Sequence, residues 1–215
     1  MVASGLAPWE EALGFSRRFF LALAFVGVVS APAQAQRGFA FSVDFGHTNV
    51  EGGNWADVMK DGVHAEIMLD YLFGSGVIIG AGYYFVSYNL QPAFGDETIS
   101  NVQPQAALGY VFDLGKVRPY AQIRGTIVRL RLEGHKETTP PDEEGENTSE
   151  QRWGTGATLM LGTEFTPWRV LTFDLAGWYG AFTTQELDLS AIGGGVIDQG
   201  RAWGVQLGIK WYPSP

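Results

Sequence analysis

The sequence predicts an all-β protein, an eight-stranded antiparallel up-and-down transmembrane β-barrel. Three observations predict this fold. Eight segments of the chain alternate between apolar and polar residues, which is the two-residue period of a β-strand. Every second connection between these segments is a short turn. The apolar faces are bulky and end in aromatic residues at both edges, as a wall that faces lipid does.

An N-terminal signal peptide is expected over residues 1–35, cleaved to leave a barrel over residues 36–215. Arg17 and Arg18 precede the apolar run from Phe19 to Val29, which is too short to span a bilayer as a helix. Ala33-Gln34-Ala35 then gives the small-x-small pattern that signal peptidase recognises, so the mature protein should begin near Gln36. The alternative is a buried N-terminal helix.

Composition narrows the class of protein further. The formal net charge of −9 argues against nucleic acid as a partner, because phosphate binding needs clustered Lys and Arg. The chain has no cysteine, so neither disulfides nor thiolate metal sites hold it together. No other run reaches the roughly 18 apolar residues of a transmembrane helix, which excludes a helical membrane protein.

The alternation is simplest in the first segment, Phe39 to Gly46, where Ala40, Ser42 and Asp44 occupy every second position. The apolar face of each segment is assigned to lipid and the other face to the lumen. Five leucines are therefore expected to face lipid near mid-membrane: Leu69, Leu108, Leu159, Leu175 and Leu207.

The third segment, Val77 to Leu90, is apolar on both faces, so its register is the hardest to read. Tyr84, Val86 and Tyr88 are assigned to lipid, because the opposite choice would place Ser87 and Asn89 there.

The connections alternate in length. Short turns follow the second, fourth and sixth segments, and long loops follow the first, third, fifth and seventh, the longest from Gly134 to about Arg152. Aromatic residues gather beside the short turns, and Tyr88, Trp153, Tyr179 and Trp203 are expected to form a second girdle toward the long loops. A soluble lipocalin-like binding barrel remains the alternative, but the polar faces carry mostly small, uncharged residues, whereas a water-facing wall normally carries many Lys and Glu.

The segments GAGYYF (Gly80 to Phe85) and KVRPYAQIRG (Lys116 to Gly125) resemble those of small outer-membrane barrels of the OmpA/OmpX type, as does the overall pattern. The resemblance implies a monomer in the bacterial outer membrane, surrounded by lipid and lipopolysaccharide, with its short turns in the periplasm. Two features depart from the pattern. The chain ends Trp211-Tyr212-Pro213-Ser214-Pro215 rather than on an aromatic residue, and no peptidoglycan-binding domain follows the barrel.

The lumen of an eight-stranded barrel is just wide enough to be filled by side chains. A polar network is expected to fill it, because buried charges must be paired. Asp113 and Arg118 should meet across a short turn, and Arg124 should reach across the lumen to Glu66, which lies at a similar height. A proton or ion path is the alternative. The expected network comprises six carboxylates and three bases: Asp44, Glu66, Asp70, Asp113, Glu164, Asp174, Arg118, Arg124 and Lys210.

A lipid A-modifying enzyme, deacylase- or acyltransferase-like, is the alternative function, since such barrels use a His with a Ser or a carboxylate near the outer rim. His64 with Glu66 is the best candidate pair, but no His-x-Ser pair occurs, and His47 and His135 are assigned to loops. No cofactor or metal motif is present. We therefore expect no catalytic residue and a non-enzymatic barrel with a structural or surface-interaction role.

The third long loop is strongly acidic. It would suit divalent cations or a basic surface partner, whereas a solvated loop whose charge aids solubility is the simpler interpretation. Its acidic residues are Glu137, Asp142, Glu143, Glu144, Glu146 and Glu150.

Overall fold

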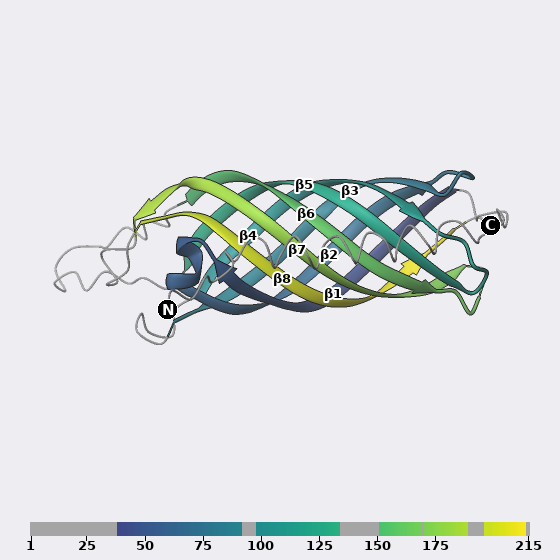
Figure 1. The fold of residues 1–215 in the computed structure, drawn as a ribbon, viewed down its shortest axis with the longest axis horizontal. Helices are drawn as coiled ribbons and strands as arrows, with labels where there is room; N and C mark the ends of the chain where they lie inside the picture. The colour runs from purple at the N-terminus through teal and green to yellow at the C-terminus, as the bar shows by residue number, and fades with distance from the viewer. Residues whose placement is uncertain (1–37, 92–97, 134–150, 169, 189–195, 214–215) are drawn as a thin grey trace, which may run out of the picture.

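A computed structural model describes residues 38–91, 98–133, 151–168, 170–188 and 196–213. Eight strands form one closed barrel in chain order, each antiparallel to its neighbours (Figure 1). No helix in these ranges is long and apolar enough to cross a membrane. The strands are β1 (Gly38–Gly52), β2 (Met59–Leu72), β3 (Val77–Leu90), β4 (Thr98–Val111), β5 (Val117–Glu133), β6 (Gln151–Phe165), β7 (Leu171–Asp188) and β8 (Val196–Trp211).

The strands slant around the barrel axis, as Figure 1 shows. A path that starts at Gly38 on β1 and moves to the paired residue on each following strand returns to β1 at Thr48. The pairing register is therefore shifted by ten residues around the barrel. A staggered closure of this kind tilts the strands by roughly 35–45°. The tilt lets side chains from non-neighbouring strands share one height inside the barrel.

Three short connections, residues 73–76, 112–116 and 166–170, form one rim, where β1 also begins and β8 ends. We call this the short-turn rim and the opposite end the long-loop rim. In the first of these turns Gly76 has φ 90°, a left-handed conformation that favours glycine. The predicted turns are confirmed.

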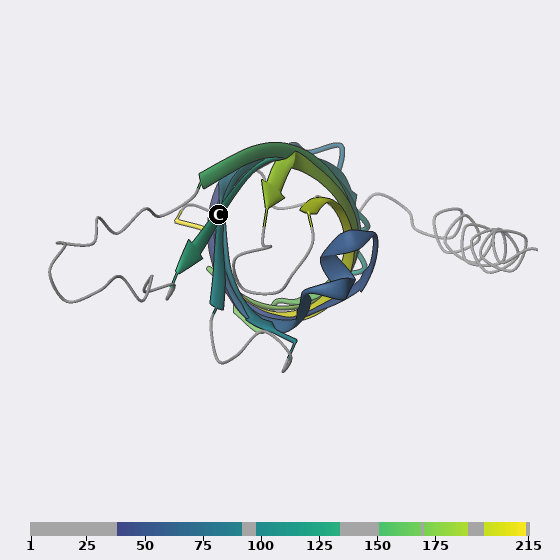
Figure 2. The same cartoon turned by 90° about the vertical axis from the view of Figure 1, so that its left-hand side faces the viewer.

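The connection after β1 differs from the prediction. It spans only residues 53–58 and contains a 3-10 helix, η1 (Asn54–Asp57), because β1 and β2 extend beyond the predicted segments. Figure 2 shows η1 at the mouth of the closed ring. Residues 134–150, which hold His135 and the acidic residues of the third long loop, and residues 1–37 lie outside the described ranges.

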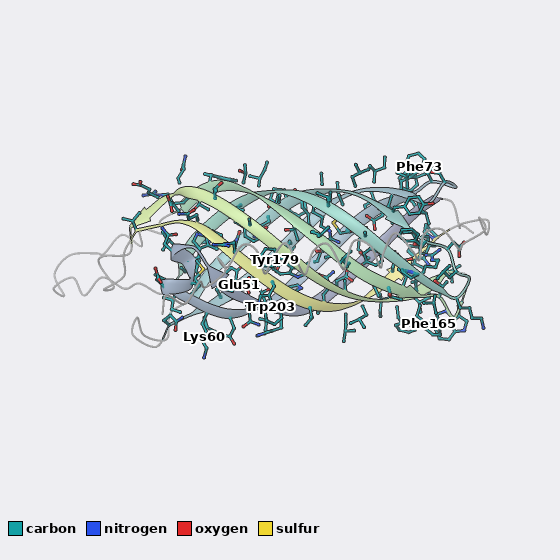
Figure 3. The ribbon with its side chains drawn as sticks, viewed as in Figure 1. Glu51, Lys60, Phe73, Phe165, Tyr179 and Trp203 are labelled. Carbon is teal, nitrogen blue, oxygen red and sulfur yellow. The ribbon has the colours of Figure 1, made fainter. Side chains whose placement is uncertain are left out.

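The outer wall is apolar, as the alternation predicts. The five leucines expected to face lipid are between 41% and 65% exposed on the isolated chain, whereas Gln206, next to Leu207, is 2% exposed. Figure 3 shows Phe73 and Phe165 on the outside at the short-turn rim, with Tyr179 and Trp203 toward the other end. On β8, Trp211 and Trp203 bound about 20 Å of wall height, near the roughly 25 Å apolar band of such barrels.

The register predicted for β3 is wrong. Tyr84, Val86 and Tyr88 are buried in the lumen, while Tyr83 and Phe85 face lipid and are 53% and 40% exposed. Ser87 and Asn89 do point outward, but they lie close to the long-loop rim, where Asn89 donates a hydrogen bond to Asp61 on β2 (3.2 Å). Tyr88 therefore does not belong to the aromatic girdle.

Candidate functional site

The buried polar and charged side chains lie in the lumen, because alternate residues of every strand point inward. Near the short-turn rim, Glu164 on β6 is the centre of a dense network. It accepts hydrogen bonds from Arg118 and from Lys210 (2.8 Å to Oε1), and Lys210 also contacts Asp70 (3.0 Å). Arg118 in turn donates to the Tyr212 hydroxyl (2.7 Å). The network joins side chains from β2, β5, β6 and β8.

A second contact crosses the lumen above this network. Arg124 on β5 donates a hydrogen bond through Nη1 to Oε2 of Glu66 on β2, and its Nη2 donates to Gln122 (3.0 Å). The expected contact between Arg124 and Glu66 is present. Ala107 pairs with Arg124 on the adjacent strand and leaves room for the long side chain.

His64 belongs to an aromatic layer at a greater height. Its Nδ1 lies 2.8 Å from the Thr48 hydroxyl, which also lies 2.9 Å from the Tyr84 hydroxyl. The imidazole ring contacts Tyr84 (4.9 Å between centroids) and Trp178 (5.9 Å). His64 is 4% exposed and points into the lumen, away from lipid.

The lumen is apolar toward the long-loop rim, which the sequence analysis did not anticipate. Trp55 of η1 is fully buried, stacks on Phe182 of β7 (5.7 Å, 4° between ring planes) and meets Tyr88 edge-on (6.5 Å). The signal was available in the sequence: three bulky apolar residues lie within the predicted first loop, namely Trp55, Val58 and Met59.

Between these layers, described side chains surround a small cavity. This cavity of about 10 Å³ lies in the middle of the lumen, lined by residues that include Glu66, Arg124 and Trp178, and it has room for about one water molecule.

Charge inside the lumen is unbalanced. Among the described inward side chains, the three cations Arg118, Arg124 and Lys210 face five carboxylates, Asp44, Glu66, Asp70, Glu164 and Asp174. Asp174 accepts a hydrogen bond from Tyr120 (2.8 Å), and Oδ1 of Asp44 has no hydrogen-bond partner. The formal charge of the lumen is therefore negative.

Asp44 and Asp174 flank one position of β8, Gly208, which pairs with both. A Cβ at Gly208 would lie 1.8 Å from Oδ1 of Asp44. Glycine is needed here because the carboxylate of Asp44 occupies the space of a side chain.

Two residues lie elsewhere than predicted. Asp113 follows the end of β4, and its Oδ1 accepts a hydrogen bond from the Gly115 amide (3.0 Å), so it stabilises its own turn and does not pair with Arg118. The expected contact between Asp113 and Arg118 is wrong, because Arg118 points to Glu164 and Tyr212. His47 lies on the exposed outer face of β1 and not in a loop, since β1 continues to Gly52.

Among the described residues, no group of three or more His, Asp or Glu side chains has the arrangement to hold a metal ion. Charge-assisted hydrogen bonds join lumen side chains of non-neighbouring strands, as in the contacts of Arg124 with Glu66 and of Lys210 with Glu164.

An apolar outer wall around a lumen that holds the buried charges defines a membrane-spanning β-barrel protein. The chain belongs to the outer membrane protein beta-barrel domain family, whose model matches residues 20–211. It is therefore a protein of the bacterial outer membrane, in contact with the lipid and lipopolysaccharide of that membrane. No curated protein matches the sequence.

Solved structures share the fold. Neisserial surface protein A is 17% identical, with a TM-score of 0.57 over 81% of this chain and 96% of its own. The Yersinia pestis attachment invasion locus protein Ail, in complex with the heparin analogue sucrose octasulfate, is 14% identical, with a TM-score of 0.50 over 82% of this chain and 99% of its own. At these identities the likeness is one of fold.

Proposed function

We propose that this protein is a non-enzymatic outer-membrane barrel with a plugged polar lumen, and that its role is structural or surface-interactive. One observation carries the proposal. Bulky and charged side chains point into the lumen at several levels, and a cavity between them has a volume of about 10 Å³. The protein would then act through the surfaces that the barrel presents, and not by letting solutes pass through its lumen.

Three successive layers support the closed lumen. Ion pairs centred on Glu164 fill the lower part, the Arg124–Glu66 contact and the His64 layer fill the middle, and Trp55 packs against Phe182 near the long-loop rim. Opening a continuous path would require breaking buried ion pairs and exposing apolar side chains to water, both of which cost free energy.

The position of His64 supports a non-enzymatic role. A lipid-modifying barrel needs its histidine where an acyl chain can reach it, whereas His64 lies inside the lumen against Tyr84 and Trp178. His47 faces outward, but its neighbours across the strands are the apolar Val63 and Val205.

The acidic segment from Glu137 to Glu150 would supply the interacting surface. Its excess of carboxylates suits a basic partner or divalent cations outside the cell. The barrel would hold this segment at the cell surface as a monomer, since outer-membrane barrels keep their longer loops extracellular.

Two measurements on the purified protein test the proposal. Proteoliposomes should swell in small sugars no faster than protein-free liposomes, and mass analysis of lipid A incubated with the protein should show no change in acyl chains. Rapid swelling would contradict the closed lumen. Loss or transfer of an acyl chain would contradict the non-enzymatic role, above all if His64→Ala abolished it.

A further inference from the structure

We propose that Asp44 and Asp174 form a proton-binding site in the lumen and share one proton across Gly208. This inference goes beyond the proposed function, because it concerns a ligand of the lumen and not the surfaces that the barrel presents. It rests on the distribution of charge in the lumen, on two carboxylates that flank one glycine, and on an oxygen atom of each carboxylate that has no hydrogen-bond partner.

The three cations of the lumen each contact carboxylates other than these two. The contacts are those of Arg118 with Glu164, of Arg124 with Glu66, and of Lys210 with Glu164 (2.8 Å) and Asp70 (3.0 Å). No ion pair in the described part of the chain includes Asp44 or Asp174, although both are buried, at 2% and 5% exposed. A carboxylate that is buried without a cation is costly, and a proton neutralises it.

The pairing of the strands places the two carboxylates on either side of one residue. Asp44 on β1 and Asp174 on β7 both pair with Gly208 on β8. Oδ1 of Asp44 occupies the place where a Cβ of Gly208 would lie, so this carboxylate reaches across β8 toward β7. Since neighbouring strands are about 4.8 Å apart, Oδ1 of Asp44 lies roughly one strand spacing from Asp174. The absence of a side chain at Gly208 makes this approach possible.

The hydrogen bonds around the two carboxylates suit one shared proton. Oδ1 of Asp44 and Oδ1 of Asp174 both lack a partner, whereas Oδ2 of Asp174 accepts a hydrogen bond from Tyr120 (2.8 Å). The Tyr120 hydroxyl favours the ionised form of Asp174, so the proton resides on Asp44. Protonated Asp44 then donates a hydrogen bond to Asp174, and this one bond satisfies both Oδ1 atoms.

The groups that face the two aspartates do not take the place of the proton. Glu66 on β2 pairs with Asp44 and is itself acidic, and Ser42 on β1 donates one hydrogen bond to Asp44. Lys210 on β8 also acts on Asp44, but it contacts two other carboxylates. The charged and titratable groups around Asp174 are Lys210, Glu164 on β6, and Tyr120 and Arg124 on β5.

A shared proton makes the stability of the barrel depend on pH. Asp44 binds the proton in the folded barrel, whereas an aspartate of the unfolded chain releases it above about pH 4. The stabilisation from this site is therefore present in mildly acidic solution and is lost as the pH rises.

Infrared spectroscopy of the folded full-length protein in detergent tests the site directly. Near neutral pH, wild type should show the carbonyl absorption of a protonated carboxyl group, and Asp44→Asn should remove it. Asp174→Asn should remove it as well, because an amide at this position donates a hydrogen bond to Asp44 and favours its ionised form. Asp57→Asn is the matched control, since it removes an exposed aspartate of η1, and it should leave the absorption unchanged.

Urea unfolding at several pH values gives the second readout. From about pH 5 toward neutrality, the unfolding equilibrium constant of wild type relative to Asp44→Asn should rise about ten-fold for each pH unit, the slope for one released proton. The proposal is overturned if wild type lacks the carboxyl absorption, or if the absorption persists in a folded Asn variant at either aspartate. Equal pH dependence of wild type and Asp44→Asn would overturn it too, as would a stability that follows sodium concentration and not pH, which would indicate a bound metal cation.

Discussion

The guanidinium of Arg124 on β5 crosses the lumen to the carboxylate of Glu66 on β2, although these strands are not neighbours in the barrel. Both side chains are almost completely buried. The contact joins two non-neighbouring strands across the lumen at mid-height. Its energetic contribution can be separated from that of the strand ladders.

Arg124→Ala should lower the free energy of unfolding in detergent by about 3–5 kcal/mol, because it leaves the buried Glu66 carboxylate without its cation. Glu66→Ala should cost a similar amount. The double variant should be more stable than the sum of the two losses predicts, since neither charge is then stranded. Urea unfolding followed by tryptophan fluorescence measures all three. Neutral single variants would show that the pair does not stabilise the barrel.

The two faces of β8 should respond differently to substitution. Leu207→Arg places a charge in lipid near the midplane and should cost about 2–4 kcal/mol. Gly208→Ala should destabilise through crowding, because its Cβ would meet Oδ1 of Asp44. Asp44→Ala should therefore recover part of the loss in Gly208→Ala and none of the loss in Leu207→Arg. Equal rescue of both variants would contradict the assignment of the faces.

Spin labels on β3 should distinguish its two faces directly. A label at Tyr83 should be broadened by oxygen dissolved in lipid, because that side chain faces outward, whereas a label at Tyr84 should be shielded in the lumen. The reverse pattern would restore the register in which Tyr84 faces lipid.

Export should remove the first 35 residues. The apolar run from Phe19 to Val29 followed by Ala33-Gln34-Ala35 predicts a mature N-terminus at or near Gln36. N-terminal sequencing of the protein from purified outer membranes measures this. Retention of Phe19 to Ser30 in the mature chain would contradict the prediction.

The sequence predicts most of the barrel because a lipid-facing wall demands strict alternation. It also predicts the contact between Arg124 and Glu66, since counting residues from the short turns shows that both side chains lie at a similar height in the lumen. Alternation does not determine the register of β3, because both faces of this strand are apolar. There the packing of Tyr84 against His64 and Trp178 in the lumen decides which face points inward. Alternation also fails at Asp113, where a residue with inward parity lies beyond the end of its strand and bonds to its own turn.

The apolar upper lumen was missed for a different reason. Alternation within the strands predicts a polar filling throughout the lumen, and it gives no position for Trp55 and Met59, which lie between the first two predicted segments. In the structure both are fully buried, since β1 and β2 extend beyond the predicted segments and η1 between them lies at the mouth of the barrel (Figure 2). In this chain, the bulky apolar residues between the first two predicted segments are the signal for the apolar upper lumen.

The central claim is that the barrel is closed to ions, and single-channel recording in planar bilayers tests it most directly. Purified wild-type protein should insert without adding a steady conductance to that of the bare membrane, because the ion pairs of Glu164, the Arg124–Glu66 contact and the Trp55 layer block the path in series. A steady ohmic conductance that grows in equal steps with each insertion would contradict the account.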